Sequence, residues 1–228
     1  MTPVKRALDL TIAILLLAVL WPVIVIFVFL LWSVEGRPVF YVSERMRTPD
    51  RAFGLVKFRT MRPRADADGG VTGGNKAAMM SRWHRIMRRT RADELPQLWN
   101  VLKGDISLVG PRPPLRRYVS AFPALYAQVL RNRPGMTGLA TLRFHRHEEW
   151  ILAACQTPEQ TEAAYRRRCI PRKARLDLIY QRNRSLWLDL RLIGETAGAP
   201  FGLRRRSGRR NKDQAAKPGE TGGNQPKV

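Results

Sequence analysis

Residues 10–34 read LTIAILLLAVLWPVIVIFVFLLWSV, and this run decides the fold because it holds no charged residue and consists largely of Leu, Ile, Val, Ala and Phe. At 1.5 Å per residue, a helix of about 25 residues reaches about 37 Å, which is enough to cross the hydrocarbon core of a bilayer. A cleaved signal peptide is the alternative, but the run is too long for one and no small-x-small cleavage site follows it. We expect residues 1–36 to form a membrane anchor.

Pro22 divides this apolar run, twelve residues from either end. A proline inside a helix removes one backbone donor and presses its ring against a carbonyl of the preceding turn, so we expect a kink there. Both flanks are basic, with Lys5 and Arg6 before the run and Arg37 and Arg45 after it. The positive-inside rule favours the cytoplasm for both flanks, which suits a helix that enters the bilayer, breaks and returns. Membrane helices also tolerate proline, so the residues alone leave a kinked single span open.

The chain is strongly basic, with 41 Lys and Arg against 18 Asp and Glu and a formal net charge of +23. This excess favours an anionic partner: a nucleic acid, an acidic membrane surface or a phosphorylated substrate. A nucleic-acid binder would show aromatic-rich basic repeats or a helix-turn-helix pattern, and because the sequence has neither we expect no nucleic-acid partner. Cys155 and Cys169 are too few for a disulfide framework and are predicted to be thiols in a reducing compartment.

After the anchor, the patterns predict a mostly helical domain with one short β-hairpin. Residues 39–42 and 53–58 read as strands, and Thr48-Pro49-Asp50 reads as the turn between them. Pro96 suits the first turn of a short helix and Gly104 its C-terminal stop. The helices are expected over 79–89, 95–103, 120–130, 148–154, 158–168 and 176–180.

Two stretches of the chain carry side chains that suit a lipid surface. Residues 79–89 place Trp83 and two methionines at helical spacing with arginines interleaved, and residues 186–193 form an apolar run around Trp187. Ordinary core packing beneath a solvated face explains each pattern equally well. Residues 63–76 are polar and rich in glycine, so we expect a mobile loop.

Asp93 and Glu94 form an adjacent acidic pair just before Pro96, in a chain crowded with arginine. The N-terminus of a helix offers free backbone N–H groups and a partial positive charge, which favour an ionised carboxylate. Such a carboxylate is able to act as a nucleophile or to hold a divalent cation, although acids also occur at helix starts simply as caps. The neighbouring Arg88, and Arg112 between two prolines that restrict its backbone, favour phosphate chemistry, because a preset guanidinium suits bidentate phosphate binding.

Motifs spread over residues 3–196 carry a resemblance to one protein family. They are Lys5-Arg6 with Asp9, Pro38 to Tyr41 with Arg45, Lys57 to Met61, Arg88, Asp93 to Gln97, Asn100 to Asp105, Ser107 to Pro113, Pro134 to Gly138, and Tyr180 with Ser185, Leu186, Leu188 and Asp189. In these residues, in their order and at their spacing, the chain resembles the bacterial sugar transferases, which are small monotopic phosphoglycosyl transferases. After Gly138 the chain departs from the family pattern over residues 139–145, so the resemblance does not name the donor sugar.

The resemblance implies an enzyme that transfers a sugar 1-phosphate from a nucleotide diphosphate sugar, usually a UDP-sugar, to undecaprenyl phosphate with release of UMP. It implies that Asp93 attacks the sugar-linked phosphate to form a covalent aspartyl intermediate, which the lipid phosphate then attacks. It assigns metal or proton handling to Glu94 and a required Mg²⁺ to a site held by Asp93. It assigns phosphate binding to Arg59, Arg88 and Arg112.

The family's hydrophobic segment is re-entrant, so the resemblance favours a helix that enters the bilayer, breaks at Pro22 and returns. Lys5 and Arg6 would then lie at the membrane interface or on the lipid phosphate. The resemblance implies a bacterial cytoplasmic (inner) membrane location among its lipids, with a catalytic domain over residues 37–202 facing the cytoplasm and a disordered basic tail over 203–228.

The implied reaction would begin the assembly of an exopolysaccharide, a capsule, an O-antigen or a glycoprotein glycan. The alternative is a catalytically inactive membrane scaffold of a polysaccharide assembly complex, against which the intact pair of Asp93 and Glu94 argues. The sequence leaves a homo-oligomer open.

Overall fold

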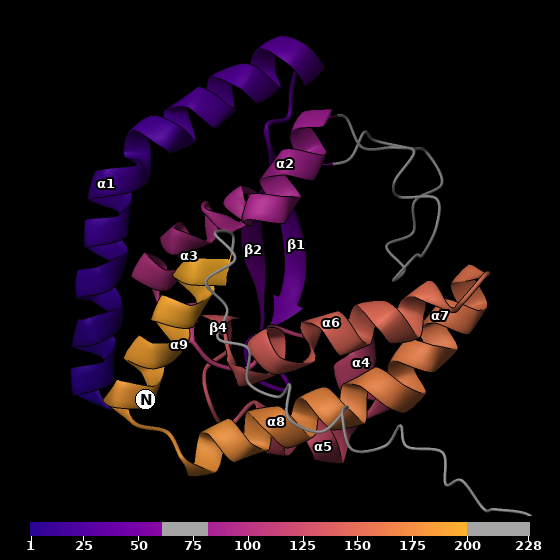
Figure 1. Cartoon of the computed structure of the whole chain (residues 1–228). Helices are drawn as coiled ribbons and strands as arrows, with labels where there is room; N and C mark the ends of the chain where they lie inside the picture. Colours follow the sequence, from indigo (N-terminus) through magenta and orange to yellow (C-terminus); the bar gives the residue numbers. More distant parts are fainter. Residues whose placement is uncertain (61–81, 200–228) are drawn as a thin grey trace, which may run out of the picture.

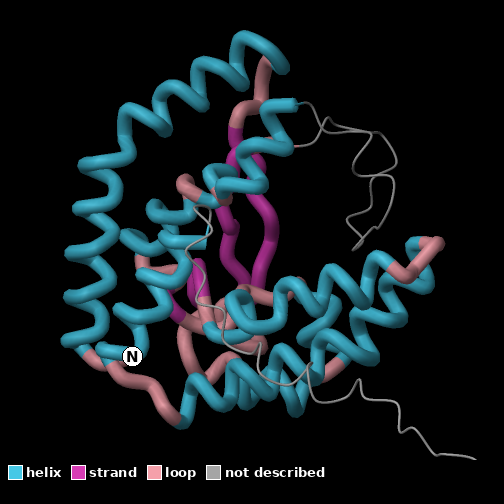
Figure 2. The backbone as a smooth tube through the Cα atoms, in the orientation of Figure 1, coloured by secondary structure: helices cyan, strands magenta, loops and turns pink. Residues whose placement is uncertain are grey.

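The computed structural model describes residues 1–60 and 82–199, and the predicted loop over 63–76 and basic tail over 203–228 lie outside these residues. Within the described residues the chain is mostly helical, with two short two-stranded sheets. Figure 2 shows the longer pair of strands near the centre of the molecule with helices around it. The prediction of a mostly helical chain with a short β-hairpin and an apolar N-terminal helix is confirmed.

The apolar run forms a single long helix, α1 (Pro3–Glu35), which Thr2 caps by accepting a hydrogen bond from the Lys5 backbone. The axis of α1 changes direction partway along the helix (Figure 1), and Pro22 lies inside it. A bend of this kind is expected where proline removes a backbone donor. The predicted kink is therefore present, but the helix continues through Pro22 and is bent rather than interrupted.

The middle of α1 is exposed. Its apolar side chains there include Val19, which is 72% exposed, and Trp21 and Phe29, which are both more than half exposed. Helix α1 is long and apolar enough to cross a membrane. An uncovered apolar surface of this extent is unfavourable in water, so this part of the helix could anchor the protein to a membrane.

Both ends of α1, in contrast, dock onto the same folded body. Near its start, the buried carboxylate of Asp9 accepts a hydrogen bond from Ser107 Oγ at 2.7 Å. Near its end, Leu31 is buried in a cluster with Phe58 and Met87. The helix therefore leaves the folded body and comes back to it, as its course in Figure 1 also shows.

The predicted hairpin is present as β1 (Phe40–Met46) and β2 (Ala52–Phe58), which pair antiparallel. Asn100, in helix α3 (Gln97–Lys103), joins the hairpin to the helical part of the fold. Its side-chain amide donates to the Gly54 carbonyl at 2.8 Å, and its side-chain carbonyl accepts from the Val56 backbone N–H at 3.0 Å. This buried side chain thus satisfies backbone groups on the free edge of β2, which is why an asparagine stands there.

The glycines in the motifs after α3 allow two backbone segments to approach closely. Strand β3 (Ser107–Val109) pairs parallel with β4 (Gly135–Thr137). A Cβ atom on Gly135 would collide with the backbone nitrogen of Gly110, and one on Gly110 would collide with the backbone of the loop that leads into β4. Only glycine allows the two segments to touch in this way, so these motifs have an architectural role.

The other helices complete the core around the hairpin. They are α2 (Arg82–Thr90), η2 (Ala92–Glu94), α4 (Arg116–Ala121), α5 (Pro123–Val129), α6 (Leu139–Ala153), α7 (Pro158–Ala164), η3 (Tyr165–Cys169), α8 (Ile170–Arg182) and α9 (Leu186–Gly198). The single helix predicted over 120–130 is wrong, because the chain forms α4 and α5, which meet at Phe122 in a non-helical conformation. Pro123 accounts for this break, since a residue before proline disfavours the helical region.

Candidate active site

Asp93 and Glu94 lie in η2, a single 3-10 turn that comes before α3. Arg91 precedes this turn with a φ of 58°, a left-handed conformation that is uncommon for a residue with a side chain. The sharp turn gives the two adjacent carboxylates different surroundings, since Glu94 is buried and Asp93 is only partly buried. Strand β2 packs beside η2 and brings Lys57 to the pair.

Glu94 is the centre of a cluster of cations. Its Oε1 accepts a hydrogen bond from Arg112 Nη2 at 2.7 Å and lies 3.4 Å from Lys57 Nζ. Its Oε2 is 3.7 Å from Arg91 Nη1. Burial alone would raise the pKa of Glu94, but the charges of Arg112 and Lys57 outweigh burial and lower this pKa to about 2. Glu94 is therefore ionised at neutral pH and holds the surrounding cations in place.

The pKa values of Arg112 and Lys57, the two cations nearest to Glu94, shift in opposite directions. The pKa of Arg112 is raised, chiefly by Glu94, so this guanidinium is a permanent cation. Burial and the nearby Arg112 lower the pKa of Lys57 to about 8, although Glu94 acts in the other direction. Both groups are charged at neutral pH, and Lys57 loses its charge in mildly alkaline solution.

Asp93 has a different electrostatic balance. Burial and the adjacent Glu94 raise its pKa, while Lys57, Arg88 and Arg112 act to lower it. Within the described part of the chain, no side chain donates a hydrogen bond to the Asp93 carboxylate. A carboxylate that is poorly solvated, unbonded and faced by cations is well suited to attack an electrophile or to hold a cation. The structure therefore brings Arg88 and Arg112, two of the three predicted phosphate-binding arginines, to the acidic pair.

The third predicted arginine, Arg59, has partners of another kind. Its Nη2 donates to the backbone carbonyl oxygens of Glu35 and Gly36, at 3.0 and 3.2 Å. These carbonyls belong to the C-terminal end of α1, which lacks intrahelical partners for them. Arg59 therefore clamps the end of the apolar helix to the end of β2, and its contact with phosphate stays a prediction.

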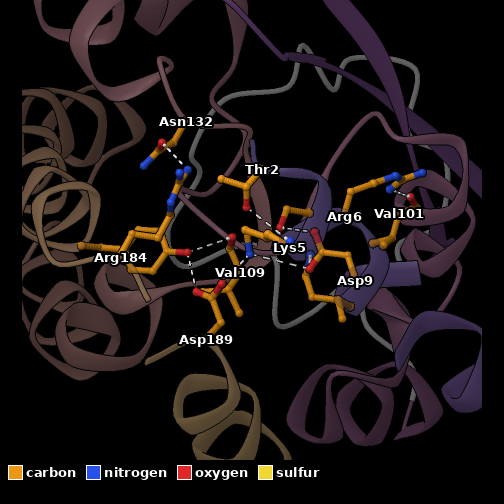
Figure 3. Close-up of polar contacts among 12 residues, drawn as sticks. Thr2, Lys5, Arg6, Asp9, Val101, Val109, Asn132, Arg184 and Asp189 are labelled. Atoms are coloured by element: carbon orange, nitrogen blue, oxygen red, sulfur yellow. Dashed lines mark hydrogen bonds and ion pairs between the residues drawn. The ribbon is translucent and has the colours of Figure 1, made fainter. Parts of the chain in front are cut away.

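Lys5 and Arg6 are also engaged within the protein (Figure 3). Lys5 is buried, and its Nζ lies 2.7 Å from Asp189 Oδ2 and 3.7 Å from Asp9 Oδ1. Tyr180 completes this network by donating its hydroxyl proton to Asp189 at 2.6 Å. Arg6 donates to two backbone carbonyls near the end of α3, at 2.7 and 2.8 Å. These contacts dock the start of α1, and the predicted contact of both cations with lipid phosphate stays a prediction.

The acidic pair is the place to test for the predicted Mg²⁺. In residues 1–60 and 82–199, no group of three or more His, Cys, Asp or Glu side chains is placed to hold a metal ion. Mg²⁺ usually takes one or two protein carboxylates and completes its shell with water and substrate phosphates. Asp93 fits this requirement, because no described side chain bonds to its carboxylate. Glu94 fits it less well, because cations already engage both of its oxygens.

Sequence reasoning did not assign a role to three residues near Arg112. Arg45 Nη1 donates to the Pro113 carbonyl at 3.4 Å, so it lies against the Pro-Arg-Pro segment. Tyr165 raises the pKa of Arg112, and Lys173 donates to the hydroxyl of Tyr165 at 3.4 Å. Arg45 stands in one of the motifs that carry the resemblance, so a signal for it existed. Tyr165 and Lys173 stand in no motif, and only the folded chain brings them to the site.

Comparison with known proteins shows what this fold and site are similar to. A family model described as "Bacterial sugar transferase" matches residues 1–202. The "Uncharacterized sugar transferase EpsL" of Bacillus subtilis is 33% identical over 189 residues, which is 83% of each chain. The "UDP-glucose:undecaprenyl-phosphate glucose-1-phosphate transferase" of Xanthomonas campestris is 34% identical over 85% of this chain but only 38% of the relative. A protein of the same name from Caulobacter vibrioides is 33% identical over 84% of this chain and 67% of the relative.

Proposed function

The chain belongs to the bacterial sugar transferase family, and on this premise we propose that it moves a sugar 1-phosphate from a UDP-sugar to undecaprenyl phosphate and releases UMP. The observation that carries the proposal is the carboxylate of Asp93, to which no side chain in residues 1–60 and 82–199 donates a hydrogen bond, beside a cluster of cations that Glu94 holds together. The names of the Xanthomonas and Caulobacter relatives support the donor and acceptor classes. They do not decide which sugar this chain transfers.

In the proposed reaction, Asp93 is the nucleophile. A carboxylate oxygen of Asp93 bonds to the sugar-linked phosphorus of the donor, and the bond from that phosphorus to the bridging oxygen breaks, so that UMP leaves with the electron pair. A phosphate oxygen of the lipid then bonds to the same phosphorus, and Asp93 leaves as a free carboxylate. The second step forms a lipid diphosphate sugar and restores the enzyme.

Charge neutralisation is the main requirement of this chemistry, because a carboxylate must approach a diphosphate that is itself an anion. Arg112, Lys57 and Arg88 supply fixed positive charge around Asp93. Asp93 would hold Mg²⁺, which would supply further charge neutralisation at the site. Glu94 stabilises the cluster in the absence of substrate and keeps Arg112 and Lys57 aimed at the site.

We further propose that α1 is re-entrant. The start and the end of α1 both contact one polar folded body, through Asp9 and Ser107 at one end and Leu31 and Phe58 at the other. A straight crossing would separate these ends by the thickness of the bilayer. With both basic flanks on one side, the positive-inside rule supports a catalytic domain that faces the cytoplasm.

Exposed tryptophans on helices around the site support contact with the membrane surface. Trp99 on α3 and Trp187 on α9 are 62% and 76% exposed, and Trp83 on α2 is 43% exposed. Tryptophan favours the boundary between lipid and water, because its ring is apolar and its N–H is polar. We therefore assign α2, α3 and α9 to the interface, where a lipid-linked acceptor would reach the acidic pair.

UMP release tests the proposed reaction. The full chain, purified in detergent, would be incubated with undecaprenyl phosphate, Mg²⁺ and a panel of UDP-sugars. We expect UMP formation by the unaltered protein, and a fall to background for Asp93→Asn, because an amide is a very poor nucleophile. Asp50→Asn is the matched control, since Asp50 is exposed in the turn between β1 and β2. UMP release that persists in Asp93→Asn would exclude Asp93 as the nucleophile, and none from the unaltered protein with any sugar would favour the inactive scaffold.

A further inference from the structure

The helical segment that runs from α7 to α8 contains an irregularity at the edge of the site. Residues Tyr165–Cys169, labelled η3, form a π-helical turn between the two α-helices. A π-turn inserted between α-helical segments costs stability, and such turns occur frequently at functional sites. Tyr165 is the first residue of this turn, so the turn sets the position of the Tyr165 side chain.

Tyr165 is held in one orientation by its neighbours. Its ring packs against Tyr118, with ring centroids 5.2 Å apart. The ammonium of Lys173 lies 5.2 Å from the Tyr165 ring centroid and donates to the Tyr165 hydroxyl at 3.4 Å. Lys173 is itself fixed by Glu148, whose two carboxylate oxygens are each 3.1 Å from the ammonium. The phenol is therefore preorganised before any ligand arrives.

Further contacts connect Tyr165 to the segment that carries Arg112. Tyr165 packs against the cluster that contains Met46 and Tyr118, and the Met46 backbone N–H donates to the carbonyl of Pro114 at 2.9 Å. Pro114 follows the Pro-Arg-Pro segment directly, so these contacts connect Tyr165, through Met46, to the segment that holds Arg112. In agreement, the pKa of Arg112 is raised first by Glu94 and then also by Tyr165.

Among the described residues, the hydroxyl of Tyr165 has no acceptor for its proton. A phenol both accepts and donates, and Lys173 already supplies the accepted hydrogen bond. Tyr165 acts to raise the pKa of both Arg45 and Arg112, and their guanidinium groups have no lone pair to offer the Tyr165 hydroxyl. Within the described part of the chain, the hydroxyl of Tyr165 therefore has a donor as its hydrogen-bond partner and no acceptor. An anionic oxygen entering between these cations would supply that acceptor.

We infer, on the basis of the proposed function, that Tyr165 donates a hydrogen bond to a non-bridging oxygen of the donor's diphosphate, and that Lys173 is a positioning residue that holds Tyr165 for this contact. The diphosphate is the favoured group because the guanidinium groups of Arg45 and Arg112 are suited to bind phosphate oxygens. Tyr165 is thus a substrate-binding residue, and the π-turn is the device that presents it.

Tyr165→Phe tests this inference, because it removes the hydroxyl and keeps the ring. Because the lost hydrogen bond is to a charged group, we expect the KM for the UDP-sugar and the Kd for UDP to rise about tenfold. The kcat and the KM for undecaprenyl phosphate should stay within about twofold of the values for the unaltered protein. Tyr118→Phe is the matched control, since the Tyr118 hydroxyl already donates to Glu162 at 3.0 Å and accepts from Arg117 at 2.9 Å. We expect it to change neither constant by more than about twofold.

Lys173→Gln tests the positioning role. Lys173→Gln should raise the KM for the UDP-sugar in the otherwise unaltered protein. It should add little further in the Tyr165→Phe variant, because both changes remove the same contact with the diphosphate. Additive effects of Lys173→Gln and Tyr165→Phe would refute the positioning role. The calorimetric Kd for UDP judges the hydroxyl directly, since UDP carries the diphosphate without the sugar.

The outcomes separate this inference from the proposed function. If Tyr165→Phe leaves the Kd for UDP unchanged, the inference is wrong. It is also wrong if the KM for the UDP-sugar rises while the Kd for UDP does not, because the contact would then be to the sugar. If the unaltered protein binds UDP but releases no UMP, the proposed reaction fails and the UDP affinities alone decide the role of Tyr165. If the unaltered protein does not bind UDP, both ideas fail.

Discussion

Replacing Glu94 with glutamine tests the electrostatic organisation of the site. The change keeps the shape of the side chain and removes the charge that faces Arg112 at 2.7 Å and Lys57 at 3.4 Å. The pKa of Glu94 falls from 4.5 to about 2 on folding, so at about 1.4 kcal/mol per unit the ionised form contributes about 3 kcal/mol to the free energy of unfolding. Because the pKa is lowered, this contribution is fully present above about pH 4.5 and is lost as the pH falls through about 2.

We expect Glu94→Gln to lower the Tm of the detergent-solubilised full chain at pH 7 by roughly 6–12 °C, since about 1 kcal/mol corresponds to about 2–4 °C in a protein of this size. Thermal unfolding followed by tryptophan fluorescence at constant salt measures this shift. Glu44→Gln is the matched control, because Glu44 makes a 2.8 Å ion pair with Arg116 in which both side chains are more than half exposed. Solvent screens that pair, so its loss should leave Tm nearly unchanged. Equal Tm values for the two variants would refute the reasoning.

Two further variants probe other buried charges. The KM for the UDP-sugar should rise above about pH 8, where Lys57 loses its proton. This alkaline rise should disappear in Lys57→Arg, because an arginine stays charged. If the pH profiles of KM for the unaltered protein and Lys57→Arg superimpose, the assignment to Lys57 is wrong. Lys5→Met should lower the free energy of unfolding by about 3–5 kcal/mol, because it leaves the buried Asp189 without its cation. Lys103→Met is the control: it removes an exposed ammonium that lies 3.8 Å from Asp105, and it should have little effect on Tm. An equally small effect of Lys5→Met would show that the buried pair of Lys5 and Asp189 is unimportant for stability.

The sequence predicted those parts of the fold that carry a local signal. The apolar run, the two strands of the hairpin and the helix that stops at Gly104 each have a composition or a stop residue that is read within a few positions. The pairing of β3 with β4 could not be predicted in this way, since each strand has 3 residues and shows no periodicity. The π-turn at Tyr165 was missed for a similar reason, because a π-turn has no distinctive local pattern.

For the site, the sequence predicted the residue types better than their partners. Asp93, Glu94 and Arg112 come together as expected, because they stand close in the chain on either side of α3. The partner of Lys5 is Asp189, at a separation of 184 residues, so no local pattern could show that this lysine is buried. A basic residue beside an apolar run predicts a lipid contact only when no distant carboxylate is available to it.

The end of strand β2 and the residue that follows it connect α1 to the acidic pair through three consecutive residues. Lys57 faces Glu94, Phe58 packs with Leu31 of α1, and Arg59 binds carbonyls at the end of α1. An extended segment has little slack, so a shift of the end of α1 relative to the acidic pair would have to break one of these contacts. In the proposed reaction the lipid acceptor stays in the bilayer while the donor arrives from water, so the site must stand at one fixed height above the membrane. The short linkage through β2 is a physical means of setting that height.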